Sequence, residues 1–230
     1  MKNRLLNIFT LTVLATIFLS SCVSMKMTDL KPDSKNIKLL PTLEPRIDLS
    51  SFESAYSLGT SISSSVGTVI GQSQISAIGT SITEATMSKD VRIQDAITIF
   101  DREVKDNITD PFGDSKGFIL CKINASIKKL GGGWAILSIL TSMIPNLFGM
   151  PVLASTITLD VDVEIYNNSE KLIARYNGIA TDKKYLAAYW GYGIHDMLRV
   201  SNIMAFRKVM NQIKKEIESD YENILIELEK

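Results

Sequence analysis

Residues 156–166 read TITLDVDVEIY, in which apolar and polar side chains alternate without a break. A period of two is typical of a β-strand with one face toward a core, because successive side chains point to opposite faces. We expect Asp160, Asp162 and Glu164 to form a solvated face, since a bare acidic row lacks the loop and glycine of a calcium site. The opposite, buried face is predicted to carry Ile157, Leu159, Val161, Val163 and Ile165.

This strand has predicted partners on both sides. Residues 167–170 are a turn signal, and residues 171–180 return as a hairpin partner. Upstream, residues 117–128 alternate again, with Ile119, Cys121, Ile123, Ala125 and Ile127 on one face. Because a free cysteine is usually buried, Cys121 is predicted to be a core residue.

Two segments repeat apolar residues at steps of three and four, which predicts helices at 90–106 and 196–228. The second would be about 50 Å long, and its apolar stripe would pack either on its own sheet or on a second copy of the chain. Residues 43–49 contain Pro45 and three charges, which favours an irregular segment. The pattern predicts an α+β fold, an antiparallel sheet of about three to five strands packed against two helices, of which the C-terminal one is long.

The composition excludes several classes of function. The chain has 25 basic and 25 acidic residues, so it lacks the basic surplus of a nucleic-acid binder. Two cysteines and one histidine leave no material for a Cys/His metal site. Neither a catalytic motif nor a phosphate-binding glycine motif is present. We therefore expect a protein that is not an enzyme, without cofactor, metal or nucleic acid.

The first 22 residues have the layout of a secretory signal peptide, with a basic start, an apolar run and small residues at the exit. The exit, Leu19-Ser20-Ser21-Cys22, resembles the lipobox of bacterial lipoproteins. The resemblance implies that residues 1–21 are removed and that Cys22 carries the lipid that binds the membrane. Residues 22–35 then form a tether. Residues 23–26, directly after Cys22, include no acidic residue, which by the same resemblance favours the outer membrane, facing the periplasm.

Residues 36–230 are predicted to form a single domain with two unusual segments. Residues 51–88 are rich in Ser, Thr and Gly but keep regularly spaced apolar residues. They are expected to form either an insertion packed on the domain or a helix that docks on a partner or membrane.

Residues 130–155 form the second, an apolar insertion that belongs to an uncharged run reaching residue 159. Pro145 leaves too short an apolar piece for a membrane span, so we expect either a hairpin that touches membrane or partner or a buried connection. The contact residues would be Trp134, Ile136, Leu137, Leu140, Ile144, Leu147 and Phe148.

The run Leu137-Ser138-Ile139-Leu140-Thr141, followed by Ile144-Pro145, resembles a link between two strands in poorly characterised bacterial envelope lipoproteins. The order of elements also resembles envelope-assembly lipoproteins of the curli-secretion type. These resemblances imply a membrane-anchored interaction or assembly protein of the cell envelope, with envelope proteins as partners.

An aromatic cluster between the last strand and the long helix supports an alternative. Residues 185–195 read YLAAYWGYGIH and hold the single histidine. Such side chains form either a recognition surface or an apolar plug beneath the helix. A small-ligand-binding or enzymatic domain would use Tyr189, Trp190, Tyr192 and His195.

Overall fold

The computed structural model describes residues 38–58, 60–61, 89–131, 133–142, 144–187 and 194–229. Three long strands form its centre: β3 (Gly117–Gly131), β4 (Pro151–Asn167) and β5 (Leu172–Ala187) pair antiparallel in that order. The short strands β1 (Leu43–Ile47) and β2 (Thr60–Ser61) pair parallel with the two ends of β3. The predicted α+β class is confirmed, and the sheet is mixed rather than wholly antiparallel.

The prediction of an irregular segment at 43–49 is wrong. Strand β1 forms there in spite of Pro45, which pairs with Ile119. Because β1 is the edge strand of the sheet, a residue without an N–H can stand in it when the missing donor faces away from the neighbour. The strand order, rather than the local sequence, makes the proline acceptable.

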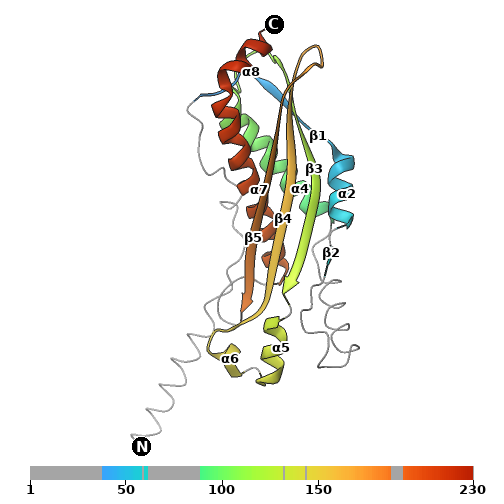
Figure 1. Cartoon of the computed structure of the whole chain (residues 1–230), viewed down its shortest axis with the longest axis vertical. Helices are drawn as coiled ribbons and strands as arrows, with labels where there is room; N and C mark the ends of the chain where they lie inside the picture. Colours follow the sequence, from blue (N-terminus) through green and yellow to red (C-terminus); the bar gives the residue numbers. More distant parts are fainter. Residues whose placement is uncertain are drawn as a thin grey trace, which may run out of the picture.

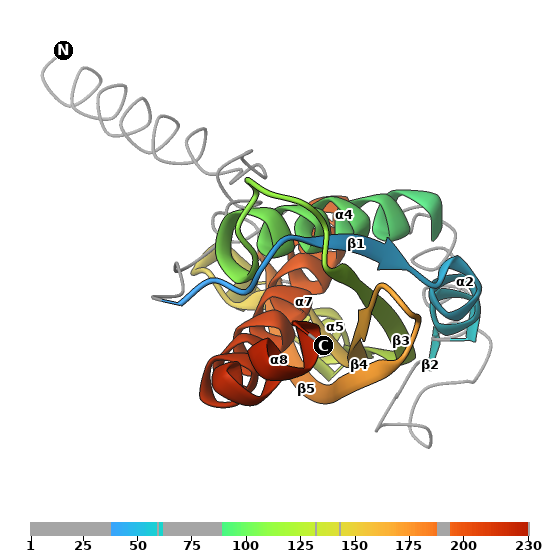
Figure 2. The same cartoon turned by 90° about the horizontal axis from the view of Figure 1, so that it is seen from above.

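The helices α4 (Lys89–Glu103), which continues into the π-helical turn η2 (Val104–Ile108), α7 (Ile194–Ser219) and α8 (Tyr221–Leu228) lie along one face of the sheet (Figures 1 and 2). Helix α2 (Leu49–Leu58) lies beside the β3 edge of the sheet, between β1 and β2 in the chain. The amphipathic helix predicted at 90–106 is thus confirmed in α4, and the predicted sheet is covered by more than two helices. Helices α4 and α7 contact one another, and α7 packs against β4 and β5.

The single helix predicted at 196–228 is instead two helices. The helix breaks at Asp220, whose carboxylate accepts a 3.0 Å hydrogen bond from the Tyr176 hydroxyl of β5. After the break, α8 still buries Ile224 and Leu228 against the same core. The apolar stripe of the C-terminal helices therefore packs on its own sheet.

The core follows the predicted alternation of β4. All five apolar residues of its inner face are at most 2% exposed, and Cys121 of β3 is fully buried beside them. Gly178 of β5 brings the sheet close to α7, because a Cβ atom there would lie 2.8 Å from Cγ1 of Val209. The strand predictions for residues 156–166 and 171–180 are confirmed, and both strands are longer than predicted.

A β-bulge between Ile123 and Ala125 overturns part of the prediction for β3. One extra residue reverses which face each later side chain takes. Ile127 is therefore 45% exposed, whereas Lys128 is only 5% exposed on the inner face. Burial and the nearby positive charge of Arg92 lower the pKa of Lys128 to about 8.

The structure describes little of the predicted segment 51–88 but most of the predicted insertion 130–155. Residues 51–58 belong to α2, which buries Phe52 and Tyr56 in the core, and most of the remaining predicted segment to residue 88 lies outside the described residues. The insertion predicted at 130–155 is shorter, because β3 extends to Gly131 and β4 begins at Pro151. Two short helices occupy the interval: α5 (Gly133–Leu140) and α6 (Ile144–Leu147).

Candidate functional site

Helices α5 and α6 form one end of the molecule, opposite α8 (Figure 1). Their apolar side chains are exposed, so the expectation of a buried connection is wrong for them. We call this surface the apolar tip and define it by Trp134, Leu137, Ile139, Leu140, Ile144, Leu147 and Phe148, which are 38–87% exposed. Ile136 lies in α5, but its side chain is outside the described part of the structure.

Two polar side chains of this end, Ser138 and Asn146, point inward. Ser138 is 1% exposed and donates its hydroxyl to the carbonyl of Trp134. Asn146 is 4% exposed and donates to the carbonyl of Met150, where the chain turns back toward β4. The Thr141 hydroxyl donates to the carbonyl of Leu137. This end therefore presents mainly hydrocarbon outward, the reverse of a soluble surface helix, and the buried Oδ1 of Asn146 has no hydrogen-bond partner among the described residues.

A row of basic side chains lies beside the apolar tip on the outer face of the sheet. In the strand register, Lys129 of β3 and Lys183 of β5 stand on either side of Thr156. Both lysines are exposed, and neither forms an ion pair with any residue that the structure describes. The Lys183 ammonium lies 5.0 Å from the ring centre of Tyr185.

A cavity of about 480 Å³ opens where this row meets α5. Trp134 and Leu137 form its apolar wall, and the two lysines lie on its polar sides. The remaining lining residues are Gly131, Ala154 and Thr156. A cavity with an apolar wall and two cations can bind a molecule that carries both an anionic group and a hydrocarbon part.

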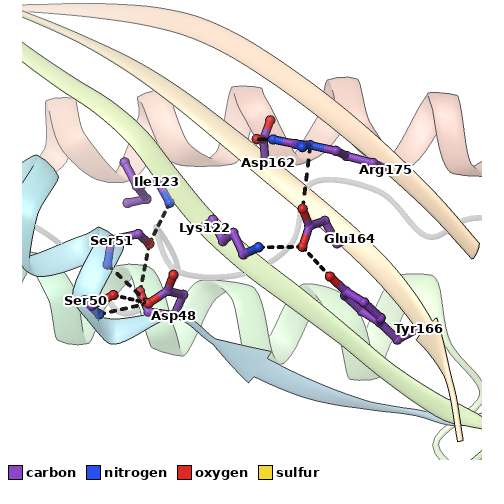
Figure 3. Close-up of polar contacts among 9 residues, drawn as sticks. All are labelled: Asp48, Ser50, Ser51, Lys122, Ile123, Asp162, Glu164, Tyr166 and Arg175. Carbon is purple, nitrogen blue, oxygen red and sulfur yellow. Dashed lines mark hydrogen bonds and ion pairs between the residues drawn. The ribbon is translucent and has the colours of Figure 1, made fainter. Parts of the chain in front are cut away.

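Further along the same sheet face, charges are paired (Figure 3). Asp162 and Glu164 are 2% and 4% exposed, so the prediction of a solvated acidic row is wrong for both. Arg175 of β5 donates to Asp162, and Lys122 of β3 donates to Glu164 over 2.7 Å. The Tyr166 hydroxyl also donates to Glu164, over 2.8 Å. Asp160, by contrast, is only partly buried.

Opposing effects act on these two carboxylates. Burial alone would raise the pKa of Asp162 and of Glu164, but the hydrogen bonds from their partners outweigh it and lower both pKa values. Each group therefore stays ionised near neutral pH. A carboxylate so firmly held as an anion is a poor proton donor, so this network joins the strands rather than performing acid–base chemistry.

Where α2 meets the sheet, Figure 3 shows a second polar cluster. Asp48 begins α2 by accepting hydrogen bonds from the backbone N–H of Ser50 and Ser51. The Ser51 hydroxyl in turn accepts the backbone N–H of Ile123, at the residue before the bulge. These contacts hold the start of the helix against β3 beside the bulge.

Other reactive groups are not arranged for chemistry. The thiol of Cys121 is buried, and burial raises its pKa, so it is a poor nucleophile. The described residues contain no group of His, Cys, Asp and Glu side chains suited to a metal ion. Tyr189, Trp190 and Tyr192 lie outside the described residues, as does the side chain of His195, whose backbone begins α7.

Sequence reasoning found the apolar tip but missed the lysines beside it. The available signal was the pair Lys128-Lys129 just before the uncharged run and the pair Lys183-Lys184 near the end of β5. Only the bulge decides which lysine of the first pair faces outward. The strand register then brings Lys129 and Lys183 together, although they are far apart in the sequence.

Among the described residues, no helix is both long and apolar enough to cross a membrane. In comparisons with known proteins, no family model matches the chain, and a search of curated proteins finds no match.

Proposed function

We propose that this chain is a lipid-anchored, non-enzymatic protein of the bacterial cell envelope that rests its apolar tip in the surface of a bilayer. Cys22 carries the anchoring lipid, and the domain faces the periplasm from the outer membrane. There it has an interaction or assembly role with envelope proteins.

The observation that carries the proposal is the reversed polarity of the tip. Large apolar side chains are exposed, while Ser138 and Asn146 are buried and hydrogen-bonded to the backbone. Exposed apolar patches of this kind mark contacts with membranes or proteins. The tip carries no charged residue, so its exposed surface can contact hydrocarbon without burying a charge.

We expect the apolar tip to bind the bilayer with moderate affinity. Fully burying one Leu or Phe side chain contributes about 1.5–3 kcal/mol, so a few inserted residues support reversible binding without the lipid. The lipid on Cys22 would make the attachment stable.

Vesicle flotation tests the tip separately from the lipid. The chain from residue 22 onward, with Cys22→Ser, is mixed with phosphatidylcholine vesicles. The triple variant Leu140→Ser/Leu147→Ser/Phe148→Ser is expected to lose at least about tenfold in binding, because each change removes an inserted side chain.

The matched control changes three exposed apolar residues at the other end: Phe112→Ser, Leu172→Ser and Ile226→Ser. It should bind as the parent does. Equal losses in the two triple variants, or binding unaffected by the tip changes, would contradict the proposal.

Anchoring needs a test in cells. Cys22→Ser in the full-length chain is expected to abolish incorporation of labelled palmitate and to leave the signal peptide uncleaved. Labelling that survives this substitution would contradict the role of Cys22.

A further inference from the structure

We propose that the cavity beside the apolar tip binds the phosphate headgroup of an anionic membrane lipid. The inference rests on the proposed function, since it names the lipid chemistry that the tip meets. Lys129 and Lys183 would hold the phosphate, and Trp134 and Leu137 would contact the acyl chain next to it.

The strand register places the two lysines for this task. Each is directly paired with Thr156, so their Cα atoms lie two strand spacings apart, or about 10 Å. Their flexible side chains can converge on one anion held between them. Alternation along the strands puts Lys128 and Asp182 on the opposite face, where both are buried.

Charges around the cavity favour an anion. The nearest carboxylate along β4 on this face is Asp160, four residues from Thr156 and therefore about 13 Å away. Asp182 is engaged on the inner face by Lys184 and Lys208. Although the whole chain has zero formal net charge, the described residues at this end of the outer face are locally basic.

The apolar wall selects a lipid over a small anion. Trp134 and Leu137 are 38% and 43% exposed and line the same cavity as the lysines. A free phosphate would leave this wall in water, whereas a lipid covers it. The headgroup site also lies directly beside the tip residues that the proposed function places in the bilayer surface, so one lipid can satisfy both.

Flotation with two vesicle compositions tests the site. The chain from residue 22 with Cys22→Ser is compared on phosphatidylcholine vesicles with and without phosphatidylglycerol. We expect the anionic vesicles to be preferred about tenfold or more, and the preference to weaken with added salt. Lys129→Gln/Lys183→Gln should remove the preference for anionic vesicles.

The matched control is Lys105→Gln/Lys171→Gln, which changes the net charge equally but at exposed ion pairs elsewhere. It should keep the preference. An equal loss in the two double variants, or a preference retained without Lys129 and Lys183, would overturn the site.

Calorimetry with soluble ligands separates the two proposals. Dihexanoylphosphatidylglycerol below its micelle concentration should bind the parent and not the Lys129→Gln/Lys183→Gln variant, and inorganic phosphate should bind more weakly. If phosphate binds as tightly as the lipid, or if neither binds, the headgroup assignment is overturned. Short-chain lipid binding without vesicle binding would overturn the proposed function alone. Equal binding to both vesicle types would overturn the headgroup site alone.

Discussion

The body of the molecule and its apolar tip differ in how charged and apolar side chains are placed. In the body, Asp162 and Glu164 have basic partners across the strands, and large apolar residues fill the core. At the tip, Leu140 and other apolar side chains are exposed to solvent, and beside it Lys129 and Lys183 form no ion pair with described residues. These side chains contribute little to the stability of the fold, and a contact with a membrane or another molecule best explains them.

The comparison predicts that substitutions in the body change stability and substitutions at the tip change binding. The largest effect on stability is expected for Lys214→Met. Lys214 and Glu103 form an ion pair of 2.9 Å in which the side chains are 2% and 1% exposed. Without Lys214, a buried carboxylate loses its cation, which costs about 3 kcal/mol of unfolding free energy in urea denaturation.

Lys105→Met is the control for this prediction, because Lys105 pairs with Asp101 at the surface. It should cost less than about 0.5 kcal/mol. Similar losses of unfolding free energy in the two variants would show that burial does not determine how much an ion pair contributes to stability in this protein.

A smaller loss is expected for Arg175→Gln. Asp162 is buried but Arg175 is 58% exposed, so water can partly replace the lost partner. We expect a loss of stability smaller than that of Lys214→Met, measured by denaturation at pH 7. Arg46→Gln, which breaks an exposed pair with Glu44, should have almost no effect. A larger effect at Arg46 than at Arg175 would contradict the role of the buried carboxylate.

The pH dependence of stability tests the bulge. Lys128 has a pKa of about 8 in the folded chain, against 10.5 for the unfolded group, so the unfolded state binds more protons between these values. Stability should therefore rise from about pH 8 toward pH 10, by an amount on the order of 1 kcal/mol. The rise should be absent in Lys128→Met and retained in Lys129→Met. A rise lost in Lys129→Met would mean that the register after the bulge is wrong.

The smallest effect on stability is expected at the tip itself. Phe148 is 87% exposed and Phe112, at the opposite end, is 85% exposed. Phe148→Ser and Phe112→Ser should each change the unfolding free energy by less than about 0.5 kcal/mol. A loss of about 3 kcal/mol or more at Phe148, as expected for a buried phenylalanine, would place that residue in the core instead.

The sequence predicts most of the fold because periodicity reports burial directly. The alternation of 156–166 gives the inner face of β4 correctly, from Ile157 to Ile165. It does not predict the bulge in β3, since the register depends on a neighbouring strand. The burial of Asp162 also depends on a partner, Arg175, that only strand pairing brings near.

The candidate site divides in the same way. The tip connects the ends of β3 and β4, and the structure shows that its apolar side chains are exposed. The sequence alone favours a buried connection and a membrane or partner contact equally. The lysine row could not be predicted, because Lys129 and Lys183 meet only through Thr156 on the strand between them.

Depth measurement at residue 148 tests the central claim most directly. A fluorophore is attached at Phe148→Cys, or at Phe112→Cys as the control, in the chain from residue 22 with Cys22→Ser; Cys121 is buried and should stay unlabelled. Vesicles carry a nitroxide on the lipid acyl chains. The account predicts strong quenching at position 148 and none at position 112. Absence of quenching at position 148, or equal quenching at both positions, would contradict it.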